Sequence, residues 1–186
     1  MHLPRLARFL LWIGGWTTVG EVPKIKKVVV IAAPHTSNWD GFWAIVYINY
    51  IGMDVSWFVK HTMFWFPLGN LIRAFNGIPL NRSKARSAVS EAIAEFDRNK
   101  TFYFGLAPEG TRSKTRGWKS GFYRIADGAN VPVVLAFLDY RNKRLGFGPT
   151  MTLSGNKDAD LAILRSFYDS IGGHTPEKTS PVVFSN

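Results

Sequence analysis

Residues 28–51 read VVVIAAPHTSNWDGFWAIVYINYI, and the prediction of the fold begins with this passage. Its first part, Val28–Ala33, is an unbroken run of β-branched and small apolar residues, which is typical of a strand buried on both faces. A short loop follows. Ser37 and Asp40 then have the spacing of a capping box, which predicts a helix that continues to about Ile51. A buried strand that leads into a helix is the repeating unit of α/β domains.

The same alternation continues along the chain. Further strands or extended segments are predicted over residues 55–59, 76–80, 101–106, 131–137 and 145–153, and helices over 64–75, 85–96, 120–128 and 161–171. We therefore predict a single α/β domain with a largely parallel or mixed central sheet flanked by helices. Gly172–Asn186 is polar and contains two prolines, and we predict a loose tail there.

Composition limits the classes of function. The 186 residues include no cysteine, which excludes a disulfide scaffold, a thiolate metal site and a cysteine nucleophile. The formal net charge of +10 favours an anionic partner, which can be a nucleic acid, an anionic membrane or a phosphorylated substrate. The aromatic content of 15% suits a protein at a lipid interface and equally a single-strand nucleic-acid binder. Composition alone does not choose between these two.

The N-terminal segment is apolar but short. No window of about 18 uncharged apolar residues exists, so a transmembrane helix is not expected. Phe9–Val19 follows Arg5 and Arg8, as in a secretory signal, but no small-residue cleavage site follows it. We interpret residues 1–20 as an amphipathic membrane-interface segment and residues 21–186 as the α/β domain, which is expected to carry the function. The alternative is an ordinary first helix that packs on the core.

His35 and Asp40 are the first candidates for chemistry. His35 stands where a strand ends and a helix begins, the place where open α/β sheets bind their ligands. A loop and one helical turn can return the Asp40 carboxylate to the imidazole, which would fix one tautomer and leave the other nitrogen to accept a hydroxyl proton. In the alternative interpretation, Asp40 only caps the helix and His35 is an ordinary loop histidine.

A second candidate is PEGTRS at residues 108–113, directly after a predicted strand. Its glycine permits close approach of the backbone, and Arg112 offers a bidentate fork for a phosphate. Two acid-free basic runs lie near it, at residues 82–86 and 112–124. The alternatives are a simple connecting turn and solvated basic faces.

These residues resemble the glycerolipid acyltransferase superfamily, which includes the 1-acyl-glycerol-3-phosphate acyltransferases. His35 and Asp40 match its H-x4-D motif, and residues 108–113 match its PEGTRS motif. Residues 66–69 and 77–82 resemble the segment that ends on a phosphate-binding arginine. Residues 119–121 and 131–134 are similar to the blocks that follow. The resemblance spans roughly residues 25–140.

The resemblance implies acyl transfer from acyl-CoA or an acyl carrier protein to a lysophospholipid hydroxyl, without a metal or other cofactor. His35 would be the general base and Asp40 would orient it. The substrate-binding residues implied are Arg82, Glu109, Gly110, Thr111, Arg112 and Lys119. The expected location is peripheral, on the cytoplasmic face of the cell membrane, with an anionic membrane surface as partner and no nucleic acid. Glycerol-3-phosphate or another lysolipid is the alternative acceptor. A basic nucleic-acid-binding module and a non-catalytic lipid-binding relative are the rival classes.

Overall fold

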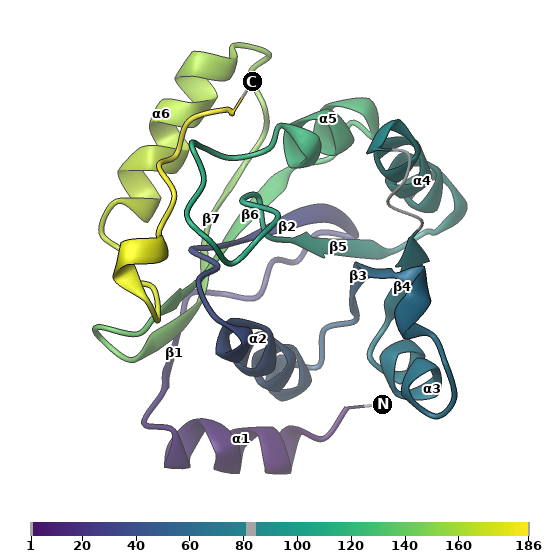
Figure 1. Ribbon diagram of the computed structural model, residues 1–186, viewed down its shortest axis with the longest axis vertical. Helices are drawn as coiled ribbons and strands as arrows, with labels where there is room; N and C mark the ends of the chain where they lie inside the picture. The colour runs from purple at the N-terminus through teal and green to yellow at the C-terminus, as the bar shows by residue number, and fades with distance from the viewer. Residues whose placement is uncertain (1, 81–84, 186) are drawn as a thin grey trace.

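The computed structural model describes residues 2–80 and 85–185, and the side chains of all of these except residues 85–87. In this part of the chain, seven strands form one sheet in the order β1-β7-β6-β2-β5-β3-β4 (Figure 1). All neighbours are parallel except β6 and β7, which are antiparallel. The predicted α/β class with a largely parallel sheet is confirmed. The strands are β1 Thr17–Val19, β2 Lys27–Ala33, β3 Val55–Lys60, β4 Gly77–Leu80, β5 Phe102–Leu106, β6 Val133–Asp139 and β7 Arg144–Met151.

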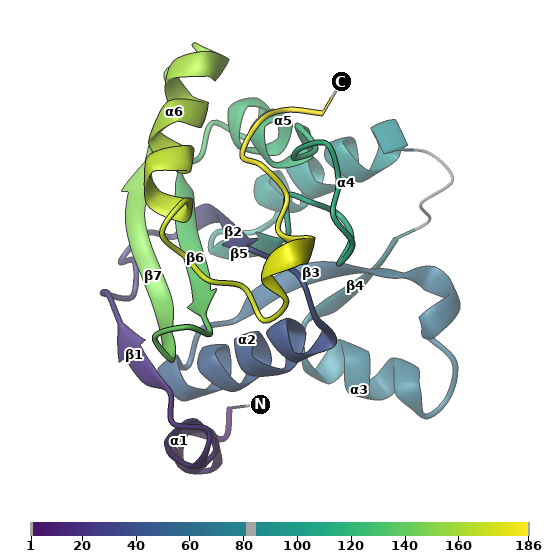
Figure 2. The ribbon, with the colours of Figure 1, turned by 60° about the vertical axis from the view of Figure 1, so that its left-hand side comes forward.

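Helices cover both faces of the sheet. α4, α5 and α6 lie on one face, and α1 and α2 lie on the other, with α3 beside β4 on the same side as α2 (Figures 1 and 2). The helices are α1 Pro4–Ile13, α2 Asn38–Ile51, α3 Leu68–Ala74, α4 Ala85–Arg98, α5 Gly121–Gly128 and α6 Lys157–Tyr168, with the 3-10 turns η1 His61–Met63 and η2 Pro176–Lys178.

Strand β2 lies at the centre of the sheet and shows why the protein has two cores. Successive side chains of a strand point to opposite faces. Val29 and Ile31 therefore join the core under α4, α5 and α6, while Val28 and Val30 join the core under α1 and α2. Burial on both faces explains the uninterrupted apolar run that predicts this strand.

The structure differs from the sequence prediction in the middle of the chain. A single helix is predicted over 64–75, but α3 begins only at Leu68 and the separate turn η1 precedes it. Pro67 stands at the N-cap of α3. A proline has no N–H to donate and is tolerated at a helix start but not in the interior, so it marks the boundary.

The prediction of a loose tail is wrong. Ser180 and Val182 are buried, and Phe184 forms a bridge with Trp118. We call residues 172–185 the C-terminal segment. It crosses the carboxyl edge of the central strands, beside both loops that carry the sequence motifs.

The N-terminal segment divides into a helix and a strand. α1 buries Ala7 and Leu11 against the core under α2, and it leaves its other face exposed. β1 then pairs with β7, so the end of the predicted interface segment also contributes to the sheet. Among the described residues, no helix combines the length and the hydrophobicity that crossing a membrane requires.

Candidate active site

The loop between β2 and α2, residues 34–37, presents His35 at the carboxyl edge of the sheet. We call it the His35 loop. Ser37 caps α2 by accepting a hydrogen bond from Trp39 N–H at 3.2 Å, and Asp40 Oδ2 accepts one from Ser37 N–H at 2.8 Å. The predicted capping box is therefore present. It fixes the direction in which the chain leaves β2.

Asp40 both caps the helix and orients the histidine. Its Oδ2 accepts from Thr36 N–H at 2.7 Å and lies 3.2 Å from His35 Nδ1. Burial of this carboxyl would raise its pKa, but hydrogen bonds from His35, Ser37 and Thr36 hold the pKa below its ordinary value. An ionised Asp40 favours the tautomer with the proton on His35 Nδ1, which leaves Nε2 with a free lone pair.

Glu109 holds the same loop from the opposite direction. β5 pairs directly with β2, so the loops that follow these two strands are adjacent. The Glu109 side chain is 2% exposed, and its Oε1 accepts from His35 N–H at 3.0 Å. Within the described residues its Oε2 has no hydrogen-bond partner, and burial raises the pKa of this carboxyl. Glu109 thus points inward rather than toward a substrate in solvent.

Arg112 lies over the start of α2. Its guanidinium donates a hydrogen bond to the Asn38 side-chain oxygen, and the arginine is exposed. An exposed guanidinium beside the N-terminus of a helix gives this side of the His35 loop a positive potential.

Lys119 packs against the PEGTRS turn at Gly110, and Thr111 forms a hydrogen bond within that turn. Gly110 has φ of +66°, and a Cβ on it would lie 2.9 Å from Lys119 Nζ, so glycine lets the lysine cross the turn. Thr111 Oγ1 accepts from Ser113 N–H at 3.3 Å and stabilises the turn. Arg82, the remaining predicted substrate-binding residue, lies outside the described residues.

Two contributions to the site have no signal in the sequence. The Tyr140 hydroxyl lies close to Asp40 without the geometry of a full hydrogen bond. Burial, and then the negative charge of Asp40, raise the pKa of Tyr140. The second contribution is Thr175, whose N–H donates to Thr36 Oγ1 at 3.1 Å. Tyr140 lies 100 positions after Asp40, and Thr175 lies 139 positions after Thr36, separations that no local pattern reveals.

The C-terminal segment also contacts the loop between β5 and α5, residues 107–120, which we call the PEGTRS loop. Ser180 Oγ accepts from Thr115 N–H at 3.0 Å, and Trp118 N–H donates to the Val183 carbonyl at 2.6 Å. Gly173 packs so closely that a Cβ there would lie 3.1 Å from atoms of both Pro34 and Thr36. One segment therefore fixes the His35 loop and the PEGTRS loop relative to each other.

A cavity of about 360 Å³ opens between this segment and the PEGTRS loop. Its wall includes Pro34, Glu109, Trp118, Ser180 and Val182. The lining combines apolar and polar residues. No group of three or more His, Asp or Glu side chains in the described part of the chain is arranged to hold a metal ion.

The arrangement suits base catalysis next to an anion. An imidazole backed by a carboxylate can take a proton from a hydroxyl and stabilise the positive charge that results. The imidazole ring is about a quarter exposed, since the His35 side chain keeps 27% of its accessible surface, so a substrate can reach it. Arg112, on the same edge, offers charge-assisted hydrogen bonds to a phosphate.

Comparisons with known proteins show the fold and the family of the chain. In overall fold the chain is similar to the crystal structure of the 1-acyl-sn-glycerophosphate (LPA) acyltransferase PlsC from Thermotoga maritima. The TM-score is 0.61 at 21% sequence identity, over 88% of this chain and 74% of the other. A comparison with curated proteins gave no match. The acyltransferase family model matches residues 17–136, which include both motif loops. The chain belongs to the acyltransferase family.

Proposed function

We propose that this chain is an O-acyltransferase that moves a fatty acyl group from acyl-CoA or an acyl carrier protein to a lysophospholipid, with 1-acyl-glycerol-3-phosphate as the proposed acceptor. The observation that carries the proposal is the contact of 3.2 Å between His35 Nδ1 and Asp40 Oδ2, next to the exposed Arg112. A base and an anion-binding group on one edge of the sheet suit an acceptor that carries a hydroxyl and a phosphate.

In the proposed reaction, His35 Nε2 takes the proton of the acceptor hydroxyl while the oxygen attacks the thioester carbonyl. The tetrahedral intermediate then collapses, the carbon–sulfur bond breaks and an ester forms. The leaving thiolate receives the proton from the imidazolium. Asp40 stabilises the imidazolium between these steps. A thioester is reactive enough for direct attack, so positioning and one base can suffice, without a metal or another cofactor.

The acceptor's phosphate is proposed to bind at Arg112, with Lys119 and the Gly110–Thr111 turn around it and with Arg82 as a further cation. Glu109 receives a different role. A buried carboxylate turned toward the His35 backbone is unsuited to bind an anion. We propose it as a positioning residue that holds the His35 loop.

The acceptor is dissolved in a bilayer, so a surface-bound enzyme encounters it far more often than a free one. We propose a peripheral location on the cytoplasmic face of the cell membrane, with the exposed face of α1 against an anionic leaflet. The net charge of +10 supports this orientation.

Release of free thiol from palmitoyl-CoA tests the proposal. The purified chain is assayed in mixed micelles with lysophosphatidic acid, with glycerol-3-phosphate or with no acceptor, and an acyl carrier protein donor is run in parallel. We expect release that depends on lysophosphatidic acid and disappears in His35→Ala. Release with glycerol-3-phosphate alone would move the acceptor to the alternative, and no release with either donor would contradict the proposal.

A further inference from the structure

The segment from η1 to the end of α3, residues 61–75, carries apolar side chains that stand in solvent. Phe66 is 83% exposed and Trp65 is 58% exposed, and Met63 and Leu71 are exposed beside them. A single exposed apolar residue is ordinary, but four within nine positions form a patch, which marks an interaction site. These residues surround Pro67, at the bend that separates η1 from α3.

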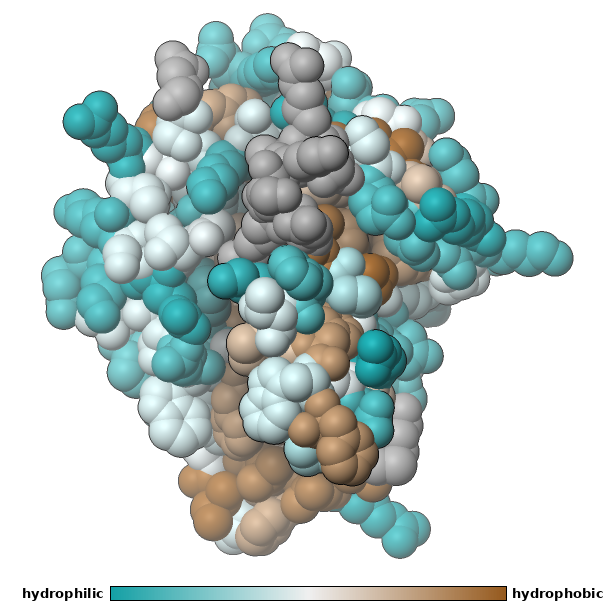
Figure 3. Space-filling model, turned by 45° about the vertical axis from the view of Figure 1, so that its right-hand side comes forward, coloured by the Kyte–Doolittle hydropathy of each residue, from teal (hydrophilic) through white to brown (hydrophobic). Residues whose placement is uncertain are grey.

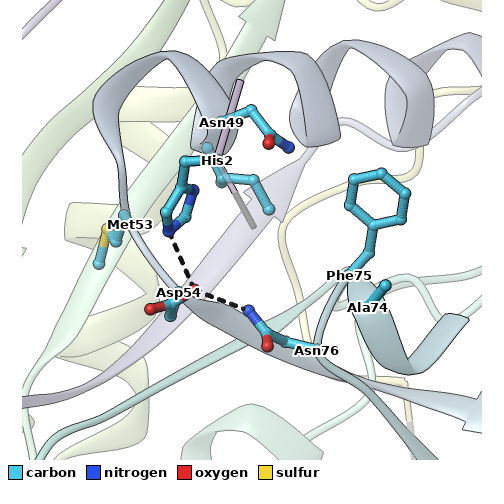
Figure 4. A pocket seen from close by; sticks show the side chains of 8 residues that line it. His2, Asn49, Met53, Asp54, Ala74, Phe75 and Asn76 are labelled. Atoms are coloured by element: carbon cyan, nitrogen blue, oxygen red, sulfur yellow. Dashed lines mark hydrogen bonds and ion pairs between the residues drawn. The ribbon is translucent and has the colours of Figure 1, made fainter. Parts of the chain in front are cut away.

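α1 lies at the same end of the molecule (Figures 1 and 2) and carries exposed apolar residues of its own. Figures 1 and 2 both place α1 and α3 in the lower half of the molecule, and Figure 3 shows hydrophobic residues gathered at that end. Figure 4 shows the junction, where Asp54 Oδ1 lies 3.0 Å from His2 Nε2 and accepts from Asn76 Nδ2 at 3.1 Å. The start of α1 is thereby tied to the chain just after α3. The exposed apolar residues of the α1 region are Leu3, Leu6, Phe9, Trp12 and Ile13.

The charged side chains of the α1 region and of the segment around α3 are all basic. Neither residues 1–20 nor residues 60–75 contain an aspartate or a glutamate. Both contain basic residues, Arg5 and Arg8 in the first and Lys60 and Arg73 in the second. The Arg73 guanidinium lies 5.1 Å from the centre of the Phe64 ring, so cation and aromatic surface are presented together. Apolar and aromatic tips with a basic border complement an anionic lipid interface.

We propose that residues 61–75 are a second lipid contact, and that the chain docks on an anionic bilayer through this segment and α1 together. We call α1 and residues 61–75 the docking face. The inference goes beyond the membrane contact proposed for α1 and does not depend on the acyl-transfer reaction. One helix in the interface leaves the protein free to roll about the helix axis, whereas a second contact away from that axis fixes the orientation.

A fixed orientation would also control how the surface near His35 faces the bilayer. α2 carries two more exposed aromatic residues, Trp39 and Phe42, whose rings contact each other at a centroid distance of 5.5 Å. Trp39 directly precedes Asp40, so the exposed apolar surface extends to the first turn after the His35 loop. Docking at two points holds this surface at a constant angle to the bilayer from which the acceptor arrives.

The absence of native cysteine allows a direct test in the full chain. Phe66→Cys, Trp12→Cys and Ile163→Cys are each labelled with an environment-sensitive fluorophore. Ile163 is the matched control, an exposed hydrophobic residue on α6, across the sheet. We expect vesicles of equal parts phosphatidylglycerol and phosphatidylethanolamine to shift the emission at positions 12 and 66 to the blue, but not at 163. A label that stays in water at 66 while position 12 inserts would overturn the second contact.

Flotation gives the size of the effect. Trp65→Ser with Phe66→Ser should lower partitioning onto the same vesicles by about tenfold or more, which corresponds to about 1.4 kcal/mol. Ile163→Ser should leave partitioning unchanged. Unchanged flotation of the double variant, together with loss of a concentration-dependent dimer, would assign the patch to a second copy of the chain instead. Neither readout requires turnover, so failure of the proposed reaction and failure of the second contact are distinguishable.

Discussion

Backbone and side-chain polar atoms of the His35 loop form hydrogen bonds with other parts of the protein, whereas apolar side chains of the docking face are exposed to solvent. Asp40, Glu109 and Thr175 all bond to the loop, from three separate parts of the chain. Phe66 and Trp12 have no comparable cover, at 83% and 74% exposure. The hydrogen bonds around the His35 loop suit the proposed positioning of reacting groups, and the exposed apolar patch suits the proposed contact with lipid. The two regions should therefore respond to mutation independently.

The largest expected effect is a loss of acyl transfer without a loss of vesicle binding. His35→Ala removes the proposed base and should lower acceptor-dependent thiol release on the order of 10³-fold. Flotation on anionic vesicles should stay unchanged, because His35 is not one of the exposed apolar or basic residues of the docking face. Thiol release and flotation are measured for this variant and for the double variant Trp65→Ser, Phe66→Ser, to test whether the two properties change independently. Loss of vesicle binding in His35→Ala would break the comparison.

A smaller effect is expected at the anion-binding edge. Arg112→Ala should raise the KM for a phosphate-bearing acceptor by about tenfold to a hundredfold, since a charge-assisted hydrogen bond contributes about 1.5–3 kcal/mol. The KM for the thioester donor should change little. Arg116→Ala removes the same charge from the same loop and should affect the acceptor less. Equal increases in the KM of both substrates would contradict the assignment.

The raised pKa of Glu109 should make the free energy of unfolding depend on pH. Burial raises its pKa in the folded chain, so the folded state binds this proton more tightly than the unfolded state does. The wild-type free energy of unfolding should therefore lose this contribution as the pH rises from about 4.3 through the raised pKa. Glu109→Gln keeps an oxygen for His35 N–H and lacks the titration.

Urea denaturation at several pH values between acid and neutral tests this behaviour. The stability of Glu109→Gln relative to the wild type should increase as the pH rises. Two curves that stay parallel over the whole range would show that the carboxyl does not have a raised pKa.

The smallest expected effect concerns the C-terminal segment. Thr36→Val removes the hydroxyl that accepts from Thr175 N–H and should lower the free energy of unfolding by about 1 kcal/mol. Turnover should also fall by a few-fold, because the His35 loop loses one of its supports. Thr152→Val, at an exposed position after β7, is the matched control. Equal behaviour of the two variants would show that the segment does not support the loop.

Local patterns predict the parts of this protein that local forces determine. The apolar run of β2 and the capping box of α2 place His35 and Asp40 correctly, because burial and capping act over a few residues. β1 is missed, since three residues carry no recognisable period and depend on pairing with β7.

The supports of the site are less predictable. Tertiary folding alone brings Thr175 to Thr36 and Tyr140 to Asp40. The inward direction of Glu109 likewise follows from the pairing of β5 with β2, which the sequence does not specify.

The hydrogen bond between Thr175 and Thr36 joins residues 139 positions apart, and this separation imposes an order on synthesis. Translation proceeds at about 5–20 residues per second, so about 7–28 s pass between the synthesis of Thr36 and that of Thr175. α1 precedes the His35 loop in the chain, so it has already been synthesised when that interval begins. If the chain docks as proposed, a nascent chain can reach a bilayer before the bond between Thr175 and Thr36 completes the support of the His35 loop.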